Sequence, residues 1–477
     1  MLVLDEFKSI IKNYILRLLG LQRKTIDNVG EKEKLESKMI YYNNGQIYFR
    51  ASANSKICCK VSVGSWYEKT KFTIEIKVLK KILEYAPIDL DQEIIIKQYN
   101  DANQKKIVYE YALEYGLCCA LIENGSIDCS NIYKLISMLE QWSSKTYEGK
   151  KVPFAFVIDV EEEADKDAIN YLEFLDSDFS ATITDGISSI IELDCNCKFK
   201  KYLSIYDDNS LDNKILSGKM KPLRFAQILY KYVTGKRLGI FLLVNGDMLL
   251  AKNGELLYVK RNKKWINICG ERYVNTLCEI VAKSKIKEAL LNSIYETTLD
   301  VSFAHSGGII AVVDYKKFIE RPIMSCVDDL NDNDYESMDE EKEKLHEKYI
   351  LQIENEKNKK LDKKEKSYLD QEFDKMFSKR KVIKQLLSVA NGKKINFVEI
   401  DRKLRMELCG LDGATILDLE GNVIAFGAII QNNRGSSGGG RGAAASRLSD
   451  FGGFATKIST DGYIELYKKK EICYQIK

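Results

Sequence analysis

The chain has 477 residues, of which 45% are hydrophobic and 30% charged, so it can bury real cores and predicts two or three domains. Its 73 Lys and Arg residues are balanced by 70 Asp and Glu residues, which argues against a dedicated duplex-DNA binder. The two histidines, His305 and His346, are too few for a histidine-rich zinc site and leave a Ser-His-Asp mechanism almost without candidates.

The cysteines and the apolar runs predict a cytoplasmic protein. The twelve cysteines contain no C-x-x-C spacing, and most lie in apolar runs, where a thiol behaves as a small hydrophobe. We therefore expect a reducing compartment and no disulfide framework. No run of eighteen apolar residues occurs, so no membrane-spanning helix is expected. Acidic residues interrupt the apolar N-terminal segment, which lacks the layout of a signal peptide.

Residues 1–38 predict an amphipathic helix followed by a charged link. Apolar residues recur every three or four positions from Leu4 to Leu21, which is the helical period. We expect this helix to pack against the protein or against a second copy, with a membrane-surface helix as the alternative.

Residues 39–206 mix strand and helix patterns and predict a separate α+β domain that acts as a sensor or partner-binding module. The stretch 180–194 is interpreted as a strand, a turn and a strand. It favours a plain hairpin, with a ligand-facing sheet as the alternative. The other expected elements are strands at 47–49, 58–63, 72–78, 93–96 and 152–158, and a helix at 132–142.

Residues 207–284 predict a connector with a helix at 216–234 and a small β-meander at 238–259. The dipeptides Asn245-Gly246 and Asn253-Gly254 are strong hairpin signals within this meander. A long helical pattern follows from Tyr273 to Leu299.

Residues 335–381 form a charged insertion within the last predicted domain, 285–470. The segment carries 13 acidic and 13 basic residues, and its sparse apolar positions lie four apart. This pattern predicts a helical insertion, such as a helical hairpin. Its role is left open between a solvated excursion and an interaction arm.

Two neighbouring features near the C-terminus carry the predicted chemistry. The segment Leu411–Ile416 puts the carboxylate of Asp412 at the mouth of an apolar strand. The segment Gly435–Gly442 is a glycine-rich loop that runs into an Ala-rich helix. Glycines let backbone N–H groups converge on an anion, and the N-terminus of the following helix adds positive potential.

This pairing of a carboxylate with a phosphate cradle predicts a nucleotide site with a divalent metal. Asp412 would bind the metal or accept a proton, and Arg441 is a preferred clamp for phosphate oxygens. Alone, a Gly/Ser run is more often a flexible loop than a phosphate site. The remaining candidate nucleotide-binding residues are Gly413, Ala414, Thr415, Ser436, Ser437, Gly438, Gly439 and Gly440.

The elements around these features are predicted in a definite order. The turn His305–Gly308 precedes a strand at 308–314, and lining of the same pocket is its alternative role. Downstream, the patterns predict a helix at 397–409, a turn and a strand within 412–419, a second strand at 422–430, a helix starting at 443–448, and two strands around Asp461-Gly462.

This order resembles the diadenylate cyclase catalytic domain, the N-terminal domain of the DNA-integrity-scanning protein and its relatives. In that family a D-G-A motif, here 412–414, is followed by G-T-R-H-R-A-A, for which 438–444 reads G-G-G-R-G-A-A. The helix ending near Leu299 with the following strand looks like the family's helix and G-A-L-I-V strand, and 458–462 looks like a shortened S-E-E-T-G turn. The resemblance covers roughly residues 285–467.

The resemblance implies a mixed-sheet α/β domain that joins two ATP molecules into cyclic di-AMP with Mg²⁺ or Mn²⁺. It also implies a homo-oligomer in which two such domains face each other. Asp412 would help activate a ribose 3′-hydroxyl, Gly413 and Ala414 would let the backbone approach the nucleotide, and Arg441 would stabilise charge at the phosphates. Two alternatives stay open, because the family's R-H-R is here a glycine-rich stretch: a degenerate domain that only binds a nucleotide, and an interaction scaffold without a ligand.

Overall fold

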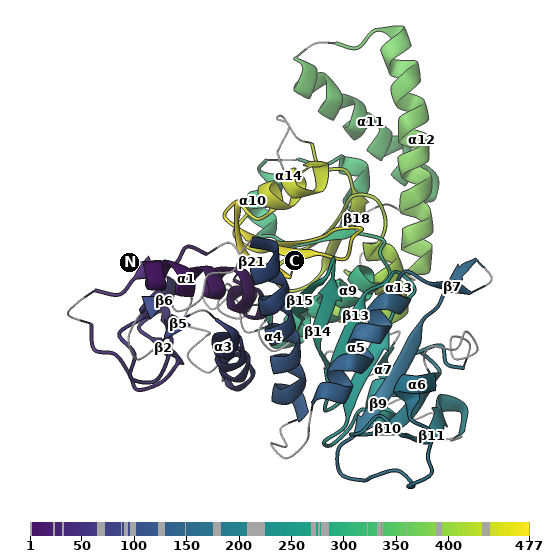
Figure 1. The fold of residues 1–477 in the computed structure, drawn as a ribbon. Coiled ribbons are helices and arrows are strands. Elements are labelled where there is room, and N and C mark those ends of the chain that lie inside the picture. Colours follow the sequence, from purple (N-terminus) through teal and green to yellow (C-terminus); the bar gives the residue numbers. More distant parts are fainter. Residues whose placement is uncertain are drawn as a thin grey trace. The chain divides into compact units, whose positions relative to one another are not determined.

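The structure is a computed structural model of the whole chain, and its fold is mixed α/β, as the sequence predicts (Figure 1). It divides into two compact units, unit 1 (Met1–Glu279 with Ile476–Lys477) and unit 2 (Ile280–Gln475). The residues that the structure describes are 2–21, 24–30, 33–63, 72–86, 88–89, 94–95, 102–122, 129–147, 149–174, 183–207, 225–268, 273–274, 277, 286–321, 323–331, 335, 337–358, 360–387, 394–431 and 439–476.

Unit 1 begins with the predicted amphipathic helix. It runs through α1 (Leu2–Ile10), a π-helical turn (Ile11–Ile15) and α2 (Leu16–Leu18). Its apolar face is buried in the core of unit 1, so the packing role predicted for it is confirmed. None of the helices in the described ranges combines the length and the apolar character that crossing a bilayer requires.

Two sheets and several helices build the rest of unit 1. The first sheet is antiparallel, with the order β1-β4-β3-β2. Its strands are β1 (Asp27–Asn28), β2 (Ile40–Asn43), β3 (Gln46–Arg50) and β4 (Cys58–Ser62). The helices are α3 (Thr73–Tyr85), α4 (Ala102–Ile122), α5 (Ser130–Trp142), α6 (Tyr171–Phe174) and α7 (Ala226–Tyr232), and two further strand pairs are β5 (Ile88–Asp89) with β6 (Ile94–Ile95) and β7 (Thr146–Tyr147) with β8 (Lys150–Lys151).

The second sheet of unit 1 has seven strands in the order β11-β10-β9-β12-β13-β14-β15. Strands β9 and β10 are parallel, and the other neighbours are antiparallel. The sheet takes strands from both 39–206 and 207–284, and it contains the predicted β-meander. Its strands are β9 (Phe154–Asp159), β10 (Ser189–Asp194), β11 (Phe199–Ser204), β12 (Leu238–Leu242), β13 (Met248–Lys252), β14 (Glu255–Arg261) and β15 (Lys264–Asn267).

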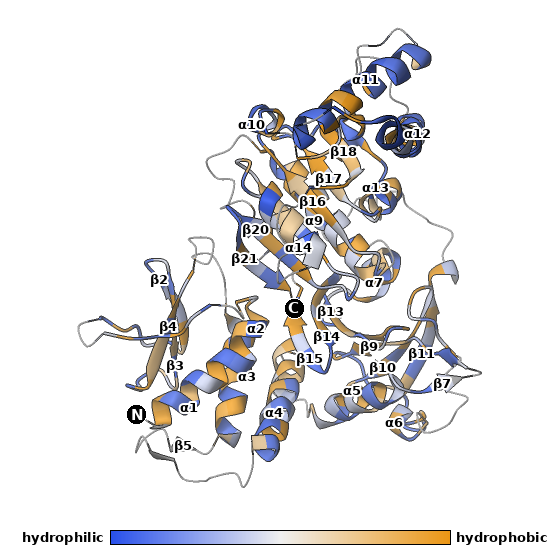
Figure 2. Ribbon diagram, turned by 90° about the horizontal axis from the view of Figure 1, so that it is seen from above, coloured by the Kyte–Doolittle hydropathy of each residue, from blue (hydrophilic) through white to orange (hydrophobic). Residues whose placement is uncertain are grey.

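Unit 2 is built on a six-stranded sheet with the order β18-β17-β16-β19-β20-β21. Strands β16 and β17 are parallel, whereas β18 and β19 run antiparallel to their inner neighbours. Figure 2 shows the central strands as the most apolar part of the unit. The strands are β16 (Gly308–Val312), β17 (Ala414–Leu417), β18 (Val423–Ala428), β19 (Phe454–Ile458), β20 (Ile464–Lys468) and β21 (Glu471–Ile476).

Helices cover both faces of this sheet. Ile309 and Ala311 of β16 share a core cluster with Ala445 of α14 (Gly439–Leu448). Helices α9 (Glu288–Phe303) and α13 (Arg402–Cys409) pack together and against the same strand. Alternate residues of a strand face opposite sides, and a Cβ at Gly308 would meet the carbonyl oxygen of Cys409, so α13 lies across the sheet from α14. The remaining short helices are α10 (Tyr315–Ile319) and two 3₁₀ turns, Cys326–Asp328 and Phe397–Glu399.

The charged insertion is a helical hairpin, as predicted. Helix α11 (Met338–Lys357) and helix α12 (Lys363–Leu386) project together from unit 2 (Figure 1), and Figure 2 colours most of their residues as hydrophilic. They share a small apolar core that includes Leu345 and Phe373. An Asn358 in the left-handed conformation ends α11, and a capping box at Asp362 starts α12.

Several predicted elements differ from the structure. The strand expected at 72–78 is the start of α3, because its apolar positions continue with the helical period through Ile82 and Leu83. In the stretch 180–194 only β10 is a strand, and 180–182 lie outside the described residues. The helix expected at 397–409 is a 3₁₀ turn and α13, divided where the Asp401 side chain caps α13.

Other expectations hold in part. Of the helix expected at 216–234, the structure describes α7, and residues 216–224 lie outside the described ranges. Most of the first half of the helix expected at 273–299 also lies outside the described ranges. Its second half is α9, which continues to Phe303. No disulfide links the cysteines that the structure describes, and Cys59, Cys118 and Cys409 are buried as small hydrophobes.

Candidate functional site

The predicted D-G-A segment forms a tight turn between α13 and β17. Gly413 has φ +110, and a Cβ there would lie 2.5 Å from the carbonyl carbon of Gly427 in β18. Gly427 has φ +61, and a Cβ there would lie 3.1 Å from the carbonyl oxygen of Asp412. The two backbones therefore meet closely: only glycine fits at 413, and the left-handed φ and the tight contact favour glycine at 427. This contact fixes the place where Asp412 leaves the sheet.

Arg441 reaches the same place from the first turn of α14. Its guanidinium lies over the backbone of Gly307, where a Cβ would stand 2.7 Å from Nη1. Gly307 has φ +70 and His305 has φ +54, so the segment before β16 is a turn, as the sequence predicts. The imidazole Nδ1 of His305 lies 2.9 Å from the carbonyl oxygen of Thr460 and holds this turn against the one before β20.

Asp412, Gly413, Ala414, Gly440 and Arg441, all predicted site residues, line one open cavity of about 370 Å³. The cavity lies between the start of β17, the end of β18 and the N-terminal turn of α14. The first peptide N–H groups of a helix lack intrahelical partners, so this end of α14 adds positive potential. The other lining residues are apolar: Ile309, Ala428, Ile429, Ile430 and Ala444.

The two charged groups of the cavity stand close but do not neutralise each other by a direct hydrogen bond. Asp412 Oδ1 lies 3.9 Å from Arg441 Nη2, and the two side chains are 89% and 36% exposed. An exposed carboxylate beside an exposed guanidinium offers a ligand for a cation and a clamp for an anion in the same small volume.

The structure places the other candidate residues differently. Thr415 is buried and is not a lining residue, because its hydroxyl faces α13 and contacts Cys409 Sγ at 3.4 Å. Gly439 starts α14 with φ +72, one residue before the cavity lining. Ser436, Ser437 and Gly438 lie outside the described residues.

The wall formed by β18 was not predicted as part of the site. The sequence offers one local indication of this wall, Gly427 in the apolar run of β18, since a glycine inside a strand often marks a place where another backbone approaches closely. The hairpin also contacts this wall, because Lys379 of α12 donates to the carbonyl oxygen of Gly427 at 2.9 Å and pairs with Asp328 at 2.7 Å. Burial raises the pKa of Asp328, although Lys379 opposes that shift.

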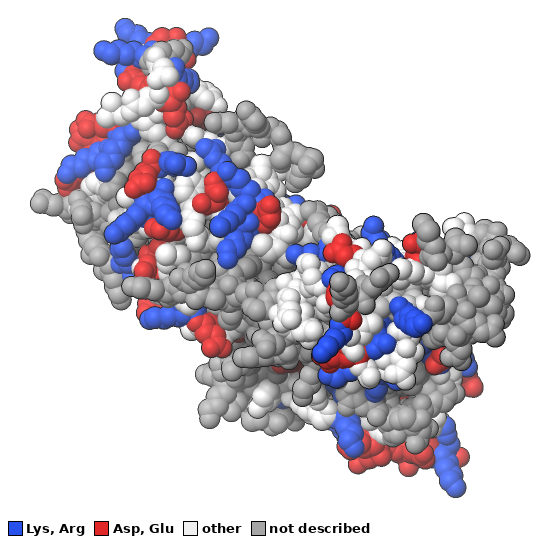
Figure 3. Space-filling model, turned by 90° about the vertical axis from the view of Figure 1, so that its left-hand side faces the viewer, with Lys and Arg blue, Asp and Glu red and all other residues white. Residues whose placement is uncertain are grey.

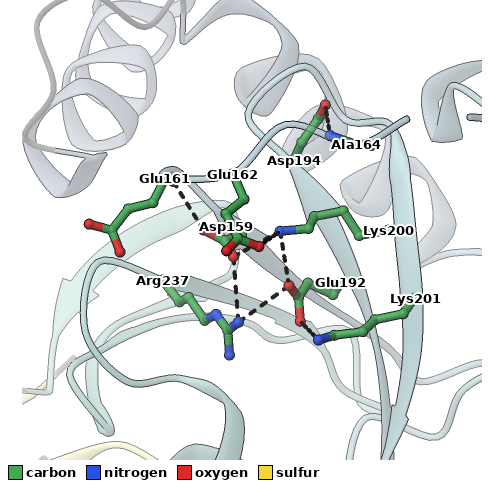
Figure 4. Close-up of polar contacts among 9 residues, drawn as sticks. All are labelled: Asp159, Glu161, Glu162, Ala164, Glu192, Asp194, Lys200, Lys201 and Arg237. Atoms are coloured by element: carbon green, nitrogen blue, oxygen red, sulfur yellow. Dashed lines mark hydrogen bonds and ion pairs between the residues drawn. The ribbon is translucent and has the colours of Figure 1, made fainter. Parts of the chain in front are cut away.

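A second charged cluster, in unit 1, was also not predicted from the sequence (Figure 4). Asp159 ends β9, Glu192 lies on the neighbouring β10, and both carboxylates pair with Lys200 and Arg237 at 3.0 to 3.4 Å. Burial raises the pKa of Asp159, but the Glu161 amide, Lys200 and Arg237 outweigh burial and hold it at about 2.

This cluster is a balanced ion network rather than an open site. Glu192 is fully buried, and Asp194 accepts hydrogen bonds from the backbone amides of Ala164, Asn196 and Lys198. Within the described ranges, no group of three or more His, Cys, Asp or Glu side chains is placed to hold a metal ion. A metal at the unit 2 cavity would therefore have one protein carboxylate, Asp412.

The surface gives no sign of a nucleic-acid interface on the face seen in Figure 3. There the basic and acidic side chains of the described residues are interspersed rather than gathered by sign. Comparison with known proteins gives no match to a protein-family model, a curated protein or a solved structure.

Proposed function

We propose that the cavity of unit 2 binds a nucleoside triphosphate with a divalent cation, and that the chain is a diadenylate-cyclase-like nucleotidyltransferase. The observation that carries this proposal is the convergence of Asp412 and Arg441, from segments separated by β17 and β18, on one cavity at the N-terminus of α14. Had the two side chains lain on opposite sides of the unit, the proposal would have failed.

Each group has a role that its chemistry suits. Arg441 and the first amides of α14 would bind phosphate oxygens, and the apolar walls from β16 and β18 would take the nucleoside. Asp412 is 89% exposed, and as a single carboxylate it fits Mg²⁺ or Mn²⁺, which takes most of its remaining ligands from phosphates and water. Such a cation would lower the charge on the triphosphate when bound.

The proposed reaction joins two ATP molecules held by two facing copies of unit 2. The 3′-oxygen of each ribose forms a bond to the α-phosphorus of the other ATP, and each pyrophosphate leaves. The 3′-hydroxyl protons pass to a base, for which Asp412 is the candidate at this cavity. One cavity holds one nucleotide, so a facing pair of cavities is required by the chemistry of a cyclic product.

A nucleotide-binding module without turnover is the second candidate. It is favoured by the composition of the 438–444 stretch, which carries a single arginine where the cyclase family has two arginines and a histidine. Fewer cations at the phosphates would stabilise the developing charge less.

The test is to incubate the full chain with radiolabelled ATP and Mn²⁺ and to separate the products. We expect a cyclic dinucleotide from the wild type and none from Asp412→Asn. Asp450→Asn is the matched control, since Asp450 is an exposed aspartate of the same unit in a surface ion pair with Lys470. Equal turnover in Asp412→Asn and the wild type would refute the assigned role of Asp412.

Thermal melting with and without ATP and Mn²⁺ separates the remaining cases. A higher melting temperature that is lost in Arg441→Ala, without any dinucleotide, supports the binding module. If ATP forms no product and does not raise the melting temperature, the nucleotide proposal is wrong and a scaffold role is favoured.

A further inference from the structure

A larger cavity, of about 550 Å³, lies within unit 1 between α4, α5 and the β14–β15 hairpin. Its size is within the range of small-molecule sites. No motif of the sequence points to it, because its walls come from three segments that are far apart along the chain. The residues that line it are Asn103, Lys106, Ile107, Glu110, Tyr111, Glu114, Tyr133, Glu140, Lys260, Asn262, Lys263, Lys264 and Trp265.

The three carboxylates of this cavity already have cationic partners. Glu110 accepts two hydrogen bonds from Arg17, at 3.1 and 2.6 Å. Lys260 lies 2.9 Å from Glu114 and 2.6 Å from Glu140, and the Lys260 side chain is only 8% exposed. Glu114 and Glu140 share Lys260, so the floor of the cavity holds three carboxylates against two cations and keeps one formal negative charge.

Three lysines at the rim have no such compensation. Lys106 of α4, Lys263 of the β14–β15 turn and Lys264 at the start of β15 are exposed, and none pairs with a carboxylate of the described residues. Asn262 has φ +47 and Lys263 has φ +63, which is a tight two-residue hairpin turn. A positive φ is unfavourable for a lysine, so the backbone conformation of the turn alone does not explain why Lys263 stands there.

Two aromatic rings stand beside these charges. Tyr111 of α4 and Tyr133 of α5 are half-buried, and their ring centroids lie 4.8 Å apart in an edge-to-face arrangement. Ile107, one turn before Tyr111, lines the same cavity with 68% of its surface exposed. The cavity thus combines a ring surface that can stack on a planar group with a cluster of uncompensated positive charge.

We propose that this cavity is a second ligand site and that it binds a nucleoside triphosphate. The base would stack on the face of one of the two rings and meet the edge of the other, because Tyr111 and Tyr133 are nearly perpendicular. The phosphates would bind Lys106, Lys263 and Lys264. The buried carboxylates at the floor can accept hydrogen bonds from the amino groups of a base. The site lies in unit 1, so it is separate from the cavity at Asp412, and it does not depend on the function proposed for that cavity.

Titration calorimetry of the full chain with each of the four common nucleoside triphosphates tests the proposal. The chain would carry Asp412→Asn and Arg441→Ala, which disable the unit 2 cavity. We expect saturable binding of at least one nucleotide, and the pair Lys263→Glu and Lys264→Glu should weaken it about tenfold or more. Lys56→Glu, an exposed lysine in another loop of unit 1, is the matched control and should leave the affinity unchanged.

A second measurement uses the unaltered chain and does not depend on a variant folding. Bound nucleotide should protect Lys263 and Lys264 from acetylation, read by mass spectrometry, while Lys56 is modified at the same rate with and without it. The proposal is overturned if none of the four nucleotides binds the chain with the disabled unit 2 cavity. It is also overturned if binding occurs but neither charge reversal nor protection involves the β14–β15 turn.

Discussion

The contact between Gly413 and Gly427 gives a sharp test of how the D-G-A turn is built. Alanine at 413 would adopt a φ of +110 and would place its Cβ 2.5 Å from the carbonyl carbon of Gly427. The backbone conformation alone costs about 1–2 kcal/mol for a residue with a Cβ. Forcing the two strands apart adds about 1–3 kcal/mol, as overpacked cores do. We therefore expect Gly413→Ala to lower the free energy of unfolding by about 2–5 kcal/mol.

Gly440→Ala is the matched control for this substitution. Gly440 lines the same cavity from α14, but a Cβ there meets no atom within 4 Å. Alanine is the better helix former, so Gly440→Ala should stabilise the protein by about 0.5–1 kcal/mol or leave it unchanged.

Urea unfolding of the full chain, followed by circular dichroism, measures the difference between the two variants. In thermal unfolding, the melting temperature of unit 2 should be roughly 5–15 °C lower in Gly413→Ala than in the wild type, given the usual scaling for a unit of this size. If the two alanine variants are equally stable, the close approach of the two backbones is not a feature of the folded protein, and our account of how Asp412 is positioned is wrong.

Three further predictions concern the hairpin and the buried charges. Phe373→Ala should weaken the packing of α11 against α12 by about 3–5 kcal/mol and make the hairpin susceptible to limited proteolysis. Tyr368 is 62% exposed, so Tyr368→Ala should have neither effect. The pKa of Asp159 is about 2, below the ordinary value of an aspartate, so the ionised carboxylate stabilises the protein above about pH 4 and this contribution disappears as the pH falls toward 2. In Asp159→Asn, the free energy of unfolding measured with urea should therefore change less with pH over this range. Lys379→Met should destabilise the protein by about 2–4 kcal/mol because buried Asp328 loses its partner, and the deficit should shrink in acid as that carboxyl takes up a proton; a deficit independent of pH would contradict this reason.

The elements that the sequence predicts best are those with a long, consistent period or a strong turn signal. The β-meander around Asn245-Gly246, the helical insertion and the strands on either side of Asp461-Gly462 are all confirmed. Strand β21 was not predicted, because the turn before it is formed by Lys469 and Lys470 at φ +48 and +69, a pair that gives no glycine or asparagine signal.

For the candidate site, the sequence identifies the kinds of residue but not the cavity. Asp412 and Arg441 stand out because a carboxylate before a strand and an arginine after glycines are recognisable patterns. Thr415 shows the limit of that reasoning, since it follows the motif directly yet faces the opposite side of the sheet. A shift of one residue along a strand reverses the face, and only the register of β17 with β16 decides which residues reach the cavity.

The order of strands explains why the two charged residues meet. Strands β16 and β17 are parallel neighbours, so the turns before them, at Gly307 and Asp412, leave the sheet at the same end. Helix α14 packs on the face that carries Ile309, and its N-terminus lies at that end too, which sets Arg441 over Gly307. A Cβ at 307 would stand 2.7 Å from Nη1 of Arg441, so the guanidinium, the flexible end of that side chain, would have to shift. We therefore expect Gly307→Ala to weaken ATP binding to unit 2, by less than Arg441→Ala does, and unaltered binding would show that the phosphates do not need the guanidinium at its place over Gly307.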